Sequence, residues 1–218
     1  MRKAIVSGAN GFVGSAVVKE LISQGYEVYA LVRENHYDQV PINEMVRIVP
    51  FSLENIEALG EVIPINEYEA FYHFAWNGSA GVDRADTALQ LKNAQWTVEC
   101  LQMAKRLGCK RFVPAGSIME HETIAAVYTQ GNRPGAGYIY GSGKVAAHMM
   151  CMSMAVKEGI NLVWPKITNA YGPSERSPRL VNSTIRKCIA GEDPQFTAGT
   201  QNYDFVYIDD VALSLIHI

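Results

Sequence analysis

Short apolar runs alternate with amphipathic stretches along the first 166 residues. Apolar runs at 3–6, 27–32, 46–49, 70–75, 111–115 and 161–166 have the length and composition of buried strands. Between them, apolar residues recur at helical spacing from Val13 to Gly25 and over 53–59, 86–107 and 140–158. Strands that alternate with helices, with few hairpin signals, predict a Rossmann-type α/β fold, a doubly wound parallel sheet.

The pattern changes after residue 168. A loop at 170–178, a helix at 180–189 and a short strand at 204–208 predict an incomplete smaller C-terminal region over 169–212. The last six residues, "LSLIHI" (213–218), match what a transposon-type sequencing adaptor encodes in one frame, although a natural short C-terminus is the alternative. We interpret them as a non-native tail on a truncated chain, leave them out of the fold prediction, and expect low or absent activity.

Composition excludes several classes of protein. The net charge is −3 without any Lys or Arg run, which argues against binding nucleic acid or an anionic membrane. No apolar stretch approaches the ~20 residues of a membrane span, and the start "MRKAIV" lacks the features of a signal peptide. The four cysteines have no metal-ligand spacing, so we expect buried thiols, no metal site and a cytoplasmic location.

The stretch "SGANGFVG" (7–14) places three glycines between the first predicted strand and the first helix. Gly8 can adopt backbone angles barred to other residues, Gly11 lets the chain approach a pyrophosphate, and Gly14 lets the helix pack on the strand. The helix N-terminus offers free N–H groups to an anion. This turn predicts dinucleotide binding.

The end of the second strand bears on the choice of dinucleotide. Val32 stands where an acidic residue would bind the ribose of NAD, and Arg33 follows, suited to the 2′-phosphate of NADP. Glu34 is the competing signal, and a solvated Arg33–Glu34 pair is the alternative without function. We predict NADP, with NAD as the alternative.

Candidate catalytic residues follow the fifth strand. "YGSGK" puts Tyr140 and Lys144 on one helical face, where the cation favours the phenolate of Tyr140 and lowers its pKa. Ser117, at the carboxyl end of the fifth strand, can orient a substrate oxygen for proton exchange with Tyr140. A Tyr/Lys pair alone is common on helix surfaces, but its order after the glycine turn and Ser117 makes it specific.

With these motifs the sequence resembles the extended short-chain dehydrogenase/reductase family, the group named for NAD-dependent epimerases and dehydratases. The resemblance covers residues 2 to about 212 and includes "HFA" (73–75), Asn93 with Thr97, "PAGS" (114–117), "NAYGP" (169–173) and "DFVYIDDVA" (204–212). It implies catalytic roles for Ser117, Tyr140, Lys144 and Asn93, and substrate contacts for Ser117 and Asn169. It implies cofactor contacts for these residues: Gly8, Asn10, Gly11, Phe12, Val13, Gly14, Arg33, Ser52, Leu53, Phe74, Ala75, Trp76, Tyr140 and Lys144. Structural roles for Asn93, Ala75 and Asn169 stay open as alternatives.

Departures from the family pattern narrow the reaction. Ile118 and Met119 replace the acidic pair of the sugar-nucleotide dehydratases, and Glu120 comes one position too late unless the loop is shifted. Ser52 replaces the acid that contacts adenine, and Tyr203 replaces an arginine that grips the nucleotide diphosphate. The segment 121–138 lies where we expect a substrate-contacting loop.

We therefore predict an NAD(P)-dependent enzyme that transfers hydride to or from a sugar, with nucleotide sugars as the expected substrates, as a keto-sugar reductase or epimerase. The alternatives are an NADPH-dependent reductase of non-sugar carbonyls, similar to dihydroflavonol reductases, and a non-catalytic NADP-binding protein. A homodimer through the helices at 86–107 and 140–158 is a further expectation from the resemblance.

Overall fold

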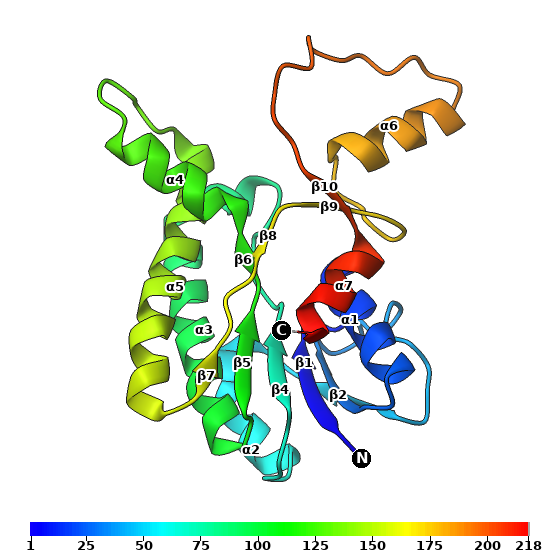
Figure 1. Cartoon of the computed structure of the whole chain (residues 1–218), viewed down its shortest axis with the longest axis vertical. Helices are drawn as coiled ribbons and strands as arrows, with labels where there is room; N and C mark the ends of the chain where they lie inside the picture. The colour runs from blue at the N-terminus through cyan, green and yellow to red at the C-terminus, as the bar shows by residue number, and fades with distance from the viewer. Residues whose placement is uncertain (218) are drawn as a thin grey trace.

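A parallel six-stranded sheet forms the centre of the molecule (Figure 1), seen here in a computed structural model that describes residues 1–217. Its strand order is β3-β2-β1-β4-β5-β7. Successive strands are added on one side of β1 up to β3 and on its other side from β4 onward, which confirms the doubly wound prediction. The strands are β1 (Lys3–Ser7), β2 (Glu27–Val32), β3 (Val46–Pro50), β4 (Ala70–His73), β5 (Arg111–Pro114) and β7 (Asn161–Leu162).

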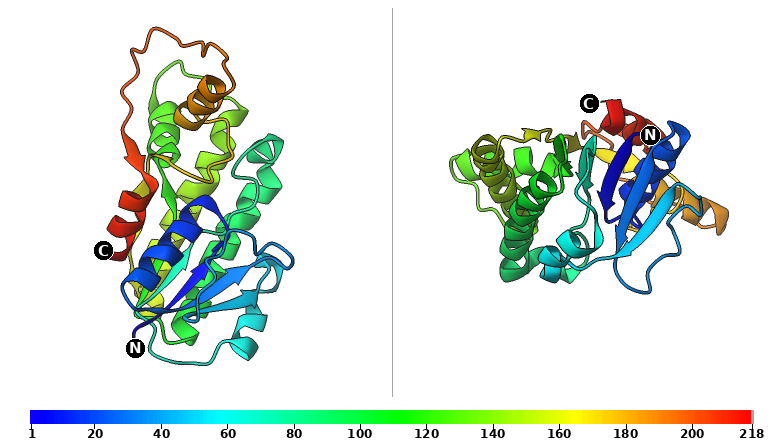
Figure 2. Two further views of the ribbon diagram at one scale, coloured as in Figure 1. Left: turned by 90° about the vertical axis from the view of Figure 1, so that its right-hand side faces the viewer. Right: turned by 90° about the horizontal axis from the view of Figure 1, so that it is seen from below.

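Helices cover both faces of this sheet, as Figure 2 shows from the side and from below. One face carries α1 (Phe12–Ser23) and α7 (Ile208–His217); the other carries α3 (Thr87–Arg106) and α5 (Ile139–Glu158). Side chains alternate along β1, so Ile5 packs toward α3 and α5 while Ala4 and Val6 pack toward α1 and α7. A 3₁₀ helix, η1 (Leu53–Ala58), and the short α2 (Leu59–Val62) follow β3.

The predicted strand at 161–166 is divided between two sheets. Its start, β7, pairs with β5, whereas β8 (Lys166–Ile167) pairs with β6 (Gly116–Ser117) in a separate two-stranded ladder. Pro165 lies between them and has no N–H to donate, but its carbonyl accepts a 2.9 Å hydrogen bond from the Gly116 N–H. The chain therefore leaves the main sheet before Pro165 and joins the second ladder after it.

The prediction of a loop at 121–138 is wrong for residues 121–128, because these belong to the helix α4 (Ile118–Tyr128). Ser117 and Glu120 form a reciprocal capping box: the Ser117 hydroxyl accepts from the Met119 N–H, and the Glu120 carboxylate accepts from the Ser117 N–H. Such a box satisfies the free N–H groups of a helix start, which explains why a helix begins here.

The C-terminal region carries a second small sheet. β9 (Asn169–Tyr171), part of which lies in the predicted loop at 170–178, pairs in parallel with β10 (Phe205–Tyr207), and α6 (Leu180–Ile189) lies between them in the chain. Helix α7 includes residues 213–217 of the stretch that we left out of the fold prediction, and its Leu215 is 3% exposed. Residue 218 lies outside the described residues, and the non-native origin of 213–218 stays a prediction.

Candidate active site

A cleft of about 730 Å³ opens at the carboxyl ends of the strands, beside the point where the strand order reverses. Ligands of doubly wound sheets bind at this position. The predicted site residues that line it are Gly8, Asn10, Gly11, Phe12, Val13, Gly14, Arg33, Ser52, Leu53, Phe74, Ala75, Trp76, Ser117, Tyr140 and Asn169. Only Lys144 and Asn93, of the predicted site residues, do not line it.

The glycine turn provides the floor of the cleft. Gly8 has a φ of +67°, and a Cβ there would lie 2.8 Å from the backbone of Phe74 and Ala75. A Cβ on Gly14 would overlap the Gly8 carbonyl. Both glycines are therefore required for the close packing of β1, α1 and the segment after β4.

The start of α1 faces the cleft without a neutralising partner. Its N-cap is Gly11, which has no side chain to cap the helix, and the first turn contains no acidic residue. The N–H groups of this turn are free to bind an anion, and the helix dipole adds a partial positive charge. The residues present thus fit the pyrophosphate of a dinucleotide.

At the adenosine end, Arg33 follows β2 directly and lines the cleft, whereas Glu34 does not. Ser52 also lines this end, and its hydroxyl caps η1 by accepting a 3.2 Å hydrogen bond from the Glu54 N–H. Arg33 is therefore the charged side chain that the strand end presents to the cleft.

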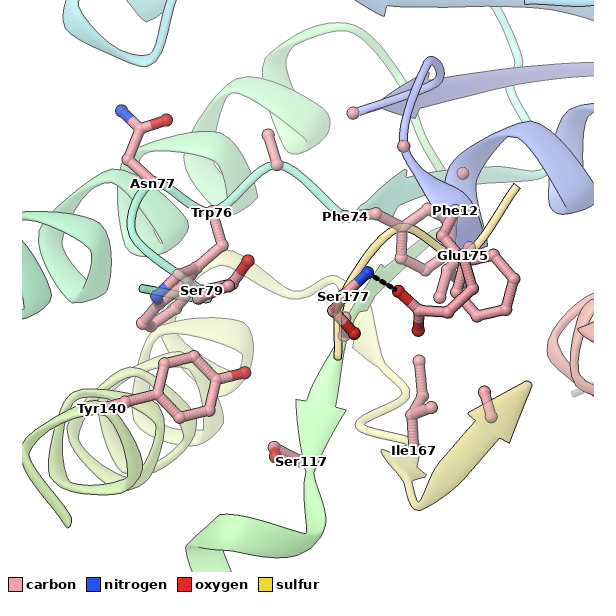
Figure 3. Close-up of a pocket in the computed structure, with 18 of the residues that line it drawn as sticks. Phe12, Phe74, Trp76, Asn77, Ser79, Ser117, Tyr140, Ile167, Glu175 and Ser177 are labelled. Atoms are coloured by element: carbon pink, nitrogen blue, oxygen red, sulfur yellow. Dashed lines mark hydrogen bonds between the residues drawn. The ribbon is translucent and has the colours of Figure 1, made fainter. Parts of the chain in front are cut away.

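Tyr140 and Ser117 lie across from each other at the opposite end, as Figure 3 shows. The Ser117 hydroxyl accepts a 3.2 Å bond from the Met119 N–H, so its own proton is available to a neighbouring oxygen. Burial raises the pKa of Tyr140, while the Ser117 hydroxyl and the positive charges of Arg84 and Arg179 act to lower it. The phenol is therefore protonated at neutral pH and can donate a proton.

Lys144 lies behind Trp76 rather than in the cleft. Its Nζ donates a 2.8 Å hydrogen bond to the Ala115 carbonyl and lies 3.5 Å from the centroid of the Trp76 ring, against 5.8 Å for Tyr140. The side chain is almost fully buried, and this burial lowers the pKa of Lys144 to about 7. Trp76 also makes an edge contact with Tyr140, with ring centroids 5.9 Å apart. Lys144 therefore does not line the cleft, and its predicted contact with the cofactor stays a prediction.

Asn93 supports the site from within α3. Its amide oxygen accepts a 2.9 Å bond from the Asn77 N–H, and its amide nitrogen donates to the carbonyls of Asn77 and Leu89. The residue is 1% exposed, so these contacts use its polar atoms without reaching the cleft. Asn93 holds the cleft-lining segment after β4 in place.

Glu120 is turned away from the cleft and buried. Besides the Ser117 N–H, its carboxylate accepts hydrogen bonds from the Trp164 indole, at 3.0 Å, and lies 2.9 Å from Nδ1 of His148. His148 and Trp164 stack with ring centroids 4.4 Å apart. Glu120 thus joins the start of α4 to α5 and to the segment between β7 and β8, and it does not line the cleft.

Arg84 and Arg179 line the cleft, but the sequence analysis did not predict them as site residues. Arg84 belongs to the 3₁₀ helix η2 (Val82–Ala85), and Arg179 is the N-cap of α6. Both follow strands whose carboxyl ends form the cleft, and this position was the signal that could have identified them.

A family model, described as the NAD dependent epimerase/dehydratase family, matches residues 4–218. The chain belongs to this family. Among curated relatives, UDP-glucuronic acid decarboxylase 1 from Xenopus tropicalis is 26% identical over 99% of this chain and 53% of the relative. The NAD(+)-dependent dTDP-6-deoxy-L-talose 4-dehydrogenase from Aggregatibacter actinomycetemcomitans is 26% identical over 97% of this chain and 77% of the relative. The chain thus spans about half the length of the decarboxylase.

Solved structures at low sequence identity share the fold. A UDP-N-acetylglucosamine 4-epimerase from Methanobrevibacter ruminantium superposes with a TM-score of 0.80 at 20% identity, covering 99% of this chain and 72% of that one. A UDP-glucuronic acid 4-epimerase from Bacillus cereus in complex with NAD gives a TM-score of 0.74 at 19% identity, covering 98% and 72%. The Rossmann prediction and the family resemblance are confirmed.

Within residues 1–217, no three His, Cys, Asp or Glu side chains come together in a way that could hold a metal ion. No helix among these residues has the length and apolar character needed to cross a membrane.

Proposed function

We propose that this chain is the cofactor-binding and catalytic part of an NAD(P)-dependent enzyme that reduces or epimerises a nucleotide sugar. The observation that carries the proposal is the shared cleft: Tyr140 and Ser117 face each other at one end of the space that the glycine turn lines. Relatives named for UDP- and dTDP-sugars support the substrate class.

The residues of the cleft divide the chemistry between them. A bound nicotinamide supplies or accepts the hydride at a substrate carbon. Tyr140, protonated at neutral pH because burial raises its pKa, gives its proton to the carbonyl oxygen in reduction and takes it back in oxidation. The Ser117 hydroxyl donates to the same oxygen and fixes its position. Replacement of the dehydratases' acidic pair by Ile118 and Met119 argues against loss of water.

NADP is the dinucleotide that Arg33 favours, because this guanidinium lines the cleft where a 2′-phosphate would lie. The solved relatives crystallised with NAD favour the alternative. Titration of the protein with NADPH and with NADH, followed by tryptophan fluorescence, decides between them, since Trp76 lines the cleft. We expect tighter binding of NADPH and a loss of about tenfold in that affinity for Arg33→Ala.

A preference for NADH that Arg33→Ala leaves unchanged would overturn the interpretation of Arg33. Binding of neither dinucleotide would overturn the cofactor site itself. Incubation with UDP-glucose, UDP-glucuronate and dTDP-glucose, with products resolved by NMR, then tests the substrate class. Conversion of only a non-sugar carbonyl panel would favour the dihydroflavonol-type alternative.

Assembly and location extend the proposal to the whole protein. Exposed apolar side chains on α5, among them Met149, Met150, Met152 and Val156, support a homodimer formed through this helix. All four cysteines are free thiols and three are buried, which supports a reducing compartment such as the cytoplasm.

A further inference from the structure

Arg84 lies directly over the ring of Tyr140. Its guanidinium carbon is 4.1 Å from the ring centroid, closer than the Lys144 ammonium at 5.8 Å, and no indole separates it from the cleft. Among the described residues, Arg84 is therefore the cation stacked on Tyr140.

The guanidinium is only partly used by the protein. One nitrogen, Nη1, donates a 2.9 Å hydrogen bond to the Ser79 carbonyl, and no carboxylate of residues 1–217 lies within 4.0 Å of it. An arginine has five N–H donors, so most of them remain for a ligand. The side chain is half-buried, which strengthens its pull on an anion relative to an arginine in open solvent.

The second arginine of the cleft is placed differently. Arg179 follows β9, which contains Asn169, and its Nε lies 3.8 Å from the buried carboxylate of Glu175. The family resemblance implies a substrate contact for Asn169, and we assign the cation on that side to the diphosphate of the substrate. Arg84 belongs to the reacting end of the sugar, because it contacts the acid–base residue itself.

We propose that Arg84 is a specificity-determining residue that binds a carboxylate carried by the sugar, close to the carbon that exchanges hydride. A planar guanidinium holds a carboxylate with two parallel hydrogen bonds, which fixes the orientation of the sugar as well as its position. The substrate would then be a nucleotide-linked uronic acid. This inference rests on the proposed nucleotide-sugar function and names its substrate class.

The experiment compares two ligands that differ only in the carboxylate. Binding of UDP-glucuronate and UDP-glucose is measured by calorimetry on the 218-residue chain saturated with the dinucleotide that binds it more tightly. We expect the unmodified protein to prefer UDP-glucuronate by about tenfold or more. Arg84→Ala should remove this preference by weakening UDP-glucuronate alone.

Two further variants separate the contact from folding. Arg84→Lys keeps the positive charge but lacks the planar guanidinium, so it should retain only part of the preference for UDP-glucuronate. This variant also allows the measurement if Arg84→Ala fails to fold. Arg106→Ala removes an exposed arginine of α3 that does not line the cleft, and this variant should bind both ligands as the unmodified protein does.

Each outcome decides the inference. Equal binding of the two sugars by the unmodified protein, or a preference that survives Arg84→Ala, overturns it. An equal loss for both sugars in Arg84→Ala shows that this arginine grips the diphosphate, which also overturns the carboxylate assignment. Binding of the dinucleotide but of neither sugar is a different failure, because it overturns the proposed nucleotide-sugar function.

Discussion

Tyr140 shows how a single side chain in this cleft is tuned by competing effects. Burial raises the pKa of its phenol, and the Ser117 hydroxyl and two arginines oppose that rise. Lys144, which the resemblance implies as the tuning cation, faces the Trp76 ring instead. The positive charge that acts on the phenol therefore comes from Arg84 of η2 and from Arg179, the N-cap of α6, rather than from Lys144 on its own helix.

Tyr140→Phe removes the exchangeable proton and leaves the ring. We expect turnover to fall by about 10²–10⁴-fold because general acid–base catalysis is lost, with dinucleotide affinity unchanged. Parallel measurement of turnover and of fluorescence titration checks both parts. Tyr26→Phe, directly before β2 and outside the cleft, is the matched control. Undiminished turnover in Tyr140→Phe would remove Tyr140 from the mechanism.

His73 is a buried residue whose pKa is lowered in the folded protein. Its Nδ1 lies 2.8 Å from the Ser7 hydroxyl, its Nε2 has no partner among the described residues, and burial lowers its pKa to about 3. A free histidine takes up a proton near pH ~6.5, so the unfolded chain gains a proton that the folded chain refuses. This histidine therefore adds no penalty above that pH and destabilises the fold increasingly below it.

The expected result is a loss of unfolding free energy of at most about 1.4 kcal/mol per pH unit from His73 as the pH falls from ~6.5 toward 4. Urea unfolding of the protein and of His73→Asn at several pH values isolates this effect, because all other groups titrate in both. Parallel pH profiles for the two proteins would contradict it.

At the scale of elements, strand ends and helix starts create the cleft together. The glycine turn joins β1 to α1, the capping box joins β6 to α4, and η2 follows β4. The first two junctions are short, so a helix begins within a few residues of a strand and leaves its first N–H groups at the sheet edge, whereas residues 74–81 separate β4 from η2. The cofactor-binding end depends most on the first junction.

Gly14→Ala tests that junction. The added methyl would overlap the Gly8 carbonyl, so the strand and α1 must separate. We expect a loss of about 1–3 kcal/mol in unfolding free energy and no saturable dinucleotide binding. Gly135→Ala is the control, since a methyl there meets no atom within 4 Å and the φ of Gly135 is negative. Normal affinity in Gly14→Ala would show that close packing of this helix is not required.

At the scale of the whole molecule, the C-terminal helix returns to the first layer. Helix α7 packs beside α1, as Figures 1 and 2 show, and Val211, Ala212 and Leu215 join the core on this face of the sheet. A segment near the end of the chain thus covers apolar surface contributed by its start.

Leu215→Ala should destabilise the protein by about 2–4 kcal/mol, because it removes methyl groups from a side chain that is 3% exposed. Leu213→Ala, on the same helix but 41% exposed, should cost less than about 0.5 kcal/mol. Thermal and urea unfolding of both variants measure the difference. Equal, small effects would mean that the end of α7 does not contribute to the core.

The sequence by itself determined the parallel sheet, the position of most helices, the glycine turn and the pairing of Ser117 with Tyr140. These features depend on local physics: residue periodicity, the backbone freedom of glycine, and the rule that parallel strands present their carboxyl ends at one edge. The sequence analysis predicts a loop where helix α4 lies, although the Ser117–Glu120 capping box is visible in the sequence. The reason is that Ser117 is assigned there only as a substrate contact.

Only the tertiary structure decided which charges reach the cleft. The Lys144 ammonium contacts the Trp76 ring and does not line the cleft. The Glu120 carboxylate is occupied by contacts with His148 and Trp164, whereas the Arg84 guanidinium stacks on the ring of Tyr140. Each of these contacts joins segments that are far apart in the chain, and each depends on the path of a loop. No periodicity along the sequence encodes such a path, because it results from the packing of whole elements against one another.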